Sequence, residues 1–227
     1  MGVATLGLVP QARGASLTWI GSANGDWFDA GNWSGSGDYP RIGDTVAITN
    51  GTILLTNSTE RLTSLTLTNA SLIFSNWTTA LNSTEVTLQN NGVLTLPAAF
   101  TNGQMSNRVY IVCSNFTLNT GGRIQTDACG YLRGNGPGKG INSGGNGGGS
   151  GGGYGGKGGT GSQSGGIAYG STHTPLDPGS GGGNGGSGSG GNGGGAILIE
   201  SVGNVTLNGI LSANGSSGSG GIYGGGG

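Results

Sequence analysis

Apolar and polar residues alternate along several short stretches of this chain, and the alternation recurs at a regular spacing. The stretch VTLQNNGVLTL at 86–96 reads as an apolar/threonine strand, a turn of Asn and Gly, and a second apolar strand. The same form occurs earlier, as VAITNGTILL at 46–55 and LTLTNASLIF at 65–74, and later, as FTLNTGGRI at 116–124 and VTLNGILSANG at 205–215. The starts at 46, 65 and 86 predict a solenoid of units about 20 residues long.

The alternation also predicts which side chains face the interior, because successive side chains of a strand point to opposite faces. The expected inward positions are Val46, Ile48, Leu65, Leu67, Val86, Leu88, Phe116 and Leu118. The expected outward positions are Thr66, Thr68, Thr87 and Thr117. We therefore predict an all-β protein, a right-handed parallel β-helix over about 44–126, with the 205–215 copy returning to the same sheet. The alternative is an antiparallel β-sandwich, because short strands with Gly and Asn turns also suit that class.

A tryptophan-rich segment precedes the repeats: TWIGSANGDWFDAGNW at 18–33, then Pro40 and GDTVAI at 43–48. It resembles the opening of large bacterial surface and autotransporter-passenger-like proteins, where a W-x-G…W…NW…P…GD-x-V segment precedes right-handed parallel β-helix coils. The resemblance covers about 30 residues. It implies a cap in which Trp19, Trp27 and Trp33 cover the open end of the apolar interior.

Four aspartates of this segment are candidates for a calcium site or for turns. Asp26, Asp29, Asp38 and Asp44 carry the oxygen ligands that calcium prefers, but they lie among Gly and Asn residues. Such neighbours are typical of turns, so we expect turn residues and no metal.

Glycine makes up about half of residues 134–195, with a local triplet spacing as in GGYGGKGGT at 152–160. A three-residue period predicts a polyglycine or polyproline-II-like segment, ordered by backbone and Cα–H···O contacts between neighbouring segments. GYGGKGG, YGS…P…PGSGG at 169–183 and GGGAILI at 193–199 resemble glycine-rich parts of bacterial and protist surface β-helix proteins. A flexible spacer is the alternative.

These patterns divide the chain into five parts, which are an extended N-terminal strand (1–15), a Trp-rich cap (16–44), the repeats (45–133), the glycine-rich segment (134–195) and a returning repeat with a glycine-rich tail (196–227). The stretch GVATLGLV at 2–9 is apolar on both faces of an extended strand and needs cover on both sides. We predict that Val3, Leu6, Leu8 and Val9 enter the next subunit by strand addition. The alternative is that this strand folds back on its own chain.

Charge is scarce, with 7% charged residues and a net charge of −1. So small a charge removes the electrostatic attraction to nucleic acids and anionic membranes, so neither is expected as a partner. No stretch is long and apolar enough to span a bilayer. Residues 1–15 have the apolar character of the end of a signal peptide but lack its basic start.

Asn-x-Ser/Thr sequons are frequent, and several share a position in the repeat. Asn50 pairs with Asn69 in this way, Asn57 with Asn76, and Asn115 with Asn204. The nine expected glycosylation sites are Asn32, Asn50, Asn57, Asn69, Asn76, Asn82, Asn115, Asn204 and Asn214. Glycans in register would align along the outside, which predicts an extracellular, cell-surface protein.

The two cysteines, Cys113 and Cys129, lack the C-x-x-C spacing of redox and zinc sites. In an exported protein we expect a disulfide, which closes a loop of ~15 residues and contributes about 3 kcal/mol. Two buried, reduced cysteines are the alternative.

No catalytic set is recognisable. Lys139 and Lys157 are each followed by Gly, which excludes a phosphate-binding loop, and His173 has only Asp177 nearby in sequence. The glutamates at 60, 85 and 200 are too scattered to form a glycosidase pair. We therefore expect no enzyme, no catalytic residues and no cofactor.

These observations predict a structural subunit that polymerises head-to-tail with copies of itself into an extracellular, N-glycosylated fibre. A surface adhesin or stalk, or an ice-binding module using outward Thr66 and Thr68, is the second hypothesis, although sequons interrupt that face. A polysaccharide-active β-helix enzyme is the third and rests on fold analogy alone.

Overall fold

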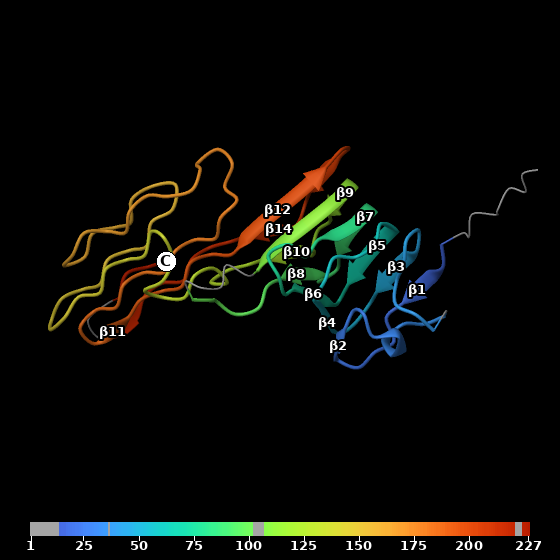
Figure 1. Ribbon diagram of the computed structural model, residues 1–227, viewed down its shortest axis with the longest axis horizontal. Helices are drawn as coiled ribbons and strands as arrows, with labels where there is room; N and C mark the ends of the chain where they lie inside the picture. The colour runs from blue at the N-terminus through green and yellow to red at the C-terminus, as the bar shows by residue number, and fades with distance from the viewer. Residues whose placement is uncertain (1–13, 36, 102–106, 221–223) are drawn as a thin grey trace, which may run out of the picture.

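Two parallel β-sheets packed face to face form the body of the molecule, and a glycine-rich lobe extends from it (Figure 1). The computed structural model describes residues 14–35, 37–101, 107–220 and 224–227. The predicted assembly strand, with Val3, Leu6, Leu8 and Val9, lies outside these residues.

The first sheet has seven strands. Six follow the order β1-β3-β5-β7-β9-β12, and the seventh, β13, also pairs with β9. Its strands are β1 (Ser16–Thr18), β3 (Thr45–Ile48), β5 (Leu62–Thr68), β7 (Leu81–Gln89), β9 (Arg108–Leu118), β12 (Ala196–Ser201) and β13 (Val205–Leu207). The second sheet has six strands in the order β14-β10-β8-β6-β4-β2. Its strands are β2 (Asn24–Asp26), β4 (Thr52–Leu55), β6 (Ser71–Phe74), β8 (Val93–Thr95), β10 (Arg123–Gln125) and β14 (Ile210–Ser212). A 3-10 turn, η1 (Ala30–Asn32), follows β2.

Each repeat places its first strand in the first sheet and its second strand in the second sheet. The turn between them reverses the chain within a few residues, with Asn69 (φ 46°) and Asn90 (φ 43°) in the left-handed region that Asn tolerates. The Asn69 amide donates to the carbonyl of Asn90 at 2.9 Å, so successive turns stack on one another. In the first repeat Gly51 (φ 87°) takes the left-handed position instead of Asn50.

The fold class predicted from the repeat is wrong. The structure consists of two open sheets of seven and six strands on either side of one core, and no barrel closes in the described part of the chain, so it is not a clear right-handed β-helix. The antiparallel sandwich is also wrong, because every strand pair within these two sheets is parallel, including Leu65 with Val86. The sharp Asn and Gly turns explain the two-layer form, because they send the chain directly from one sheet to the other.

Three columns of side chains run through the core from strand to strand, and all twelve residues are at most 1% exposed. In the first sheet they are Val46–Leu65–Val86–Phe116 and Ile48–Leu67–Leu88–Leu118. In the second sheet the column is Ile53–Leu72–Leu94–Ile124. All eight inward positions predicted from the alternation are thus buried, and the four outward threonines are partly exposed.

The glycine lobe comprises residues 130–195 with 213–220 and 224–227. Its only strands in the described residues are β11 (Gly188–Ser189) and β15 (Ser219–Gly220), an antiparallel pair. Backbone hydrogen bonds join the other segments of the lobe to one another, as predicted for side-by-side glycine segments, for example from Gly193 to the carbonyl of Tyr131 at 2.9 Å. A Cβ atom at Gly193 would lie 1.9 Å from the carbonyl oxygen of Gly179. The packing therefore requires glycine.

Candidate assembly site at the ends of the sheets

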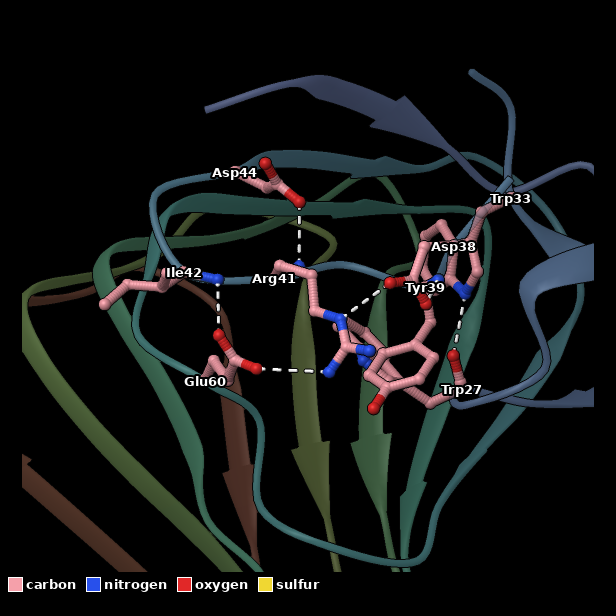
Figure 2. A network of polar contacts seen from close by, with 8 residues as sticks. All are labelled: Trp27, Trp33, Asp38, Tyr39, Arg41, Ile42, Asp44 and Glu60. Carbon is pink, nitrogen blue, oxygen red and sulfur yellow. Dashed lines mark hydrogen bonds and ion pairs between the residues drawn. The ribbon is translucent and has the colours of Figure 1, made fainter. Parts of the chain in front are cut away.

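The two ends of the sheet stack differ, and the difference begins with the tryptophans at the first end. Trp19, Trp27 and Trp33 are 0–3% exposed, with ring centroids 5.2 Å apart for Trp19–Trp33 and 4.9 Å for Trp27–Trp33. The Trp33 indole donates to the Trp27 carbonyl at 2.7 Å (Figure 2). Edge-to-face contacts of this kind are favourable for aromatic rings, so the three rings cover the end of the core.

A polar network on Arg41 fixes the loop beside this aromatic cap (Figure 2). Arg41 Nε donates to Asp38 at 2.8 Å, its Nη1 donates to Glu60 at 3.2 Å, and the guanidinium lies 3.9 Å from the Tyr39 ring centroid. The Arg41 hydrogen bond lowers the pKa of the Asp38 carboxyl. Glu60 also accepts from the Ile42 amide at 2.8 Å. The network links the loop before β3 to the connection before β5.

The four aspartates proposed as calcium ligands or turn residues all accept backbone amides. Asp26 accepts from Phe28 at 2.7 Å and Asp29 from Gly31 at 2.9 Å. Asp38 accepts from Tyr39 at 2.8 Å, and Asp44 accepts from the amide of Arg41 at 2.7 Å and, across the chain, from that of Ala15 at 2.7 Å. No group of three or more His, Cys, Asp or Glu side chains that could hold a metal occurs among the described residues. Their positions fit the turn interpretation.

The opposite end of the stack is open. Val205 and Leu207 of β13 lie in register with Phe116 and Leu118, and Leu211 of β14 lies in register with Ile124. These three residues continue the buried columns, yet they are 48%, 51% and 49% exposed. Each column therefore ends in a core-type side chain that no further strand of the described residues covers.

The open end lacks, within the residues that the structure describes, the features that usually protect edge strands. No strand in the described part of the chain pairs with the outer edges of β12, β13 and β14. Natural edges are commonly blocked by Lys, Pro or inward charges, whereas residues 196–215 contain one charged residue, Glu200, and no proline. Glu200 accepts a hydrogen bond from Tyr110 at 2.7 Å, which ties β12 to β9. This edge is held in place and available for pairing.

A hollow of about 380 Å³ adjoins the open end, between the sheets and the glycine lobe. Ile197 of β12 and Leu211 of β14 line it from the sheets, and Tyr154 and Pro175 line it from the lobe. Asp177 is the only ionisable carboxylate in its lining. The volume lies within the range of ligand pockets, about 300–1,000 Å³, and the lining is mainly apolar.

The nine sequon asparagines fall into two groups in the structure. Asn50, Asn57, Asn69 and Asn204 are exposed, and no hydrogen bond from their side-chain nitrogen is seen among the described residues. In the other five sequons that nitrogen, to which a glycan would attach, donates to a nearby oxygen. These residues are Asn32, Asn76, Asn82, Asn115 and Asn214. The alignment of sequons along the sequence did not reveal this division, because it depends on contacts between repeats.

The predicted disulfide is not present, because Cys113 and Cys129 are both free thiols. Cys113 is buried on β9 of the first sheet, whereas Cys129 follows β10 of the second sheet and its thiol donates to the Asp127 carbonyl at 3.2 Å. Burial raises the pKa of both thiols, so the reactive thiolate form is disfavoured. The prediction used only their separation of 16 residues in the sequence, which does not indicate that the two cysteines belong to different sheets.

The other residues considered for chemistry lie apart. His173 is exposed in a turn, with Nδ1 3.0 Å from the Thr172 hydroxyl. Glu60 belongs to the Arg41 network, and Glu85 accepts from Asn115 at 2.7 Å. On the outer face of the first sheet, four threonines in register form one column: Thr66, Thr87, Thr117 and Thr206. The sequence alone did not show that this column is continuous.

No helix in the described residues is long and apolar enough to cross a membrane. In comparisons with protein-family models, with characterised proteins and with solved structures, no match to this chain was found. Any assignment of function therefore depends on the geometry of the two ends.

Proposed function

We propose that this protein is the structural subunit of an extracellular, N-glycosylated filament that grows at the ends of its sheet stack. The observation that carries the proposal is the exposure of Val205, Leu207 and Leu211, which continue columns that are otherwise buried. Exposed apolar side chains beside unpaired strand edges favour association with another chain. The capped end, covered by Trp19, Trp27 and Trp33, gives such an assembly two different ends.

The low charge supports an assembling protein with a glycosylated outer surface. With 7% charged residues the chain has little electrostatic repulsion between copies. Glycans on Asn50, Asn57 and Asn69 would hydrate the turns and connections between strands, whereas a glycan on Asn204 would lie next to β13 at the open end.

The test is to produce the chain in a secreting eukaryotic host and examine it by electron microscopy and sedimentation velocity. We expect filaments with one regular axial repeat and an intact mass that decreases on enzymatic deglycosylation. Isolated monomers at high protein concentration would rule out the filament, and an unchanged mass would rule out the glycans. The Asn50→Gln, Asn57→Gln and Asn69→Gln variants should each lose one glycan. In Asn82→Gln, where the wild-type side-chain nitrogen donates a hydrogen bond to the Thr59 carbonyl, the number of glycans should stay unchanged.

One observation favours a second candidate, ice binding. The column of Thr66, Thr87, Thr117 and Thr206 repeats at the spacing of parallel strands, about 4.8 Å. Its neighbours are not threonine columns: Ser64, Glu85 and Asn115 flank it on one side. The regular surface is therefore one residue wide, and the filament remains the preferred proposal. Thermal hysteresis that disappears in Thr87→Leu would reverse this preference.

A further inference from the structure

We infer that the open end is an acceptor groove for the N-terminal segment, residues 2–9, of a second copy of this chain. The inference rests on the proposed filament and identifies the contact that joins its subunits. The groove is formed by the outer edges of β12 and β14 and by the hollow of about 380 Å³ between the sheets and the glycine lobe.

The groove defines the chemistry of its occupant. Its two edge strands offer backbone groups, so an extended segment can add to them as a further strand. Ile197 and Leu211 in the hollow, and the exposed Val205 and Leu207 of β13 at the same end of the stack, favour aliphatic side chains in the occupant. A negatively charged residue would be desolvated there without a partner, because the only charged side chain in the lining, Asp177, is itself acidic.

Residues 2–9, GVATLGLV, meet these requirements. The segment carries no charge, and its only polar side chain is that of Thr5. Its alternation places Leu6 and Leu8 on one face and Val3 and Val9 on the other, so one face can enter the hollow while the other covers β13. Gly7 lies between the two leucines and allows close approach to the glycine backbones of the lobe.

The segment of the same copy cannot reach this groove. It leads into β1, which lies at the opposite edge of the first sheet, and a new strand beyond β12 would be six strand spacings away, about 29 Å. The seven residue steps from Val9 to Ser16 span at most about 25 Å when fully extended. The occupant must therefore come from a second copy.

The experiment uses the full chain, a fluorescent peptide of residues 1–13 as probe, and two matched variants. Leu211→Glu places a charge in the groove at a side chain that is already half exposed, and Ile42→Glu places the same charge on an exposed isoleucine beside the cap. We expect saturable binding of one peptide per chain by fluorescence anisotropy. Leu211→Glu should weaken binding at least tenfold, and Ile42→Glu should leave it unchanged within twofold.

Assembly is measured in parallel by sedimentation velocity, so that the inference and the filament can fail separately. We expect excess peptide, Leu211→Glu or deletion of residues 1–10 to leave single subunits. Filaments that form without residues 1–10 would overturn the inference and leave the filament proposal intact. A peptide that binds a chain which never forms filaments would support the groove and overturn the filament. Equal binding to both glutamate variants would also overturn the inference.

Discussion

The stacked sheets and the glycine lobe are held together in opposite ways. In the sheets, side chains fill the space between two layers, as Phe74, Phe116 and Leu65 do at 0% exposure. In the lobe, backbones touch directly, and Gly193 and Gly166 would each place a Cβ atom 1.9 Å from a carbonyl oxygen of a neighbouring segment. Side-chain burial stabilises the first region, and backbone hydrogen bonds at very short range stabilise the second.

The comparison shows that close packing can require the absence of a side chain at one position as strictly as it requires an apolar side chain at another. We expect the sheets to tolerate changes on their outer face, where threonines are partly exposed, but not in the columns between the layers. In the lobe we expect glycines with free space around them, such as Gly144, to tolerate an added side chain. Substitutions in each region, and a change of pH that acts on the lobe, test this difference.

The largest effect is expected in the sheets. Phe74→Ala removes a fully buried ring from the second sheet and leaves a cavity, which should lower the free energy of unfolding by about 3–5 kcal/mol. Thr66→Ala on the outer face is the control and should change it by at most about 1 kcal/mol. Urea unfolding followed by circular dichroism measures both. Similar losses in the two variants would show that the space between the sheets is not the stabilising core.

An intermediate effect is expected in the lobe, from adding one carbon atom. Gly193→Ala forces a methyl group against the Gly179 carbonyl, and because the neighbour is backbone, it should destabilise the lobe by about 1–3 kcal/mol. Gly144→Ala, whose Cβ has no atom within 4 Å, is the matched control. Hydrogen exchange of the lobe amides reports the loss. Equal protection in both variants would contradict backbone packing.

The smallest effect is a selective loss of lobe stability at alkaline pH. Burial raises the pKa of Tyr169 to about 12, whereas an unfolded tyrosine titrates near 10. Between these values the unfolded state has lost a proton that the folded state retains, so this contribution to stability is complete below pH 10 and falls as the pH rises toward 12.

Phenolate absorbance and lobe hydrogen exchange over this pH interval test the prediction. Tyr169→Phe should remove this part of the pH dependence, although it also removes the hydrogen bond from the Tyr169 hydroxyl to the Pro178 carbonyl. Titration of Tyr169 near pH 10 in the folded protein would show that the lobe does not shield this ring.

The sequence alone determined the local structure of the repeats. Alternation placed Leu65 and Leu67 inside and Thr66 outside, because a strand gives successive side chains to opposite faces. The positions of the turns could also be predicted from the sequence, since Asn69 and Asn90 occupy the left-handed conformation that few other residues accept. These features depend only on neighbours along the chain.

The tertiary structure alone decided how the repeats combine. The sequence did not show that the strands form two open sheets, that Cys113 and Cys129 remain free thiols, or that Leu211 is exposed while Ile124 beside it is buried. Val86 and Val205 occupy equivalent places in the repeat and differ only in whether another strand follows them in space. Burial depends on what packs against a residue, and for residues far apart in sequence only the folded chain sets those contacts.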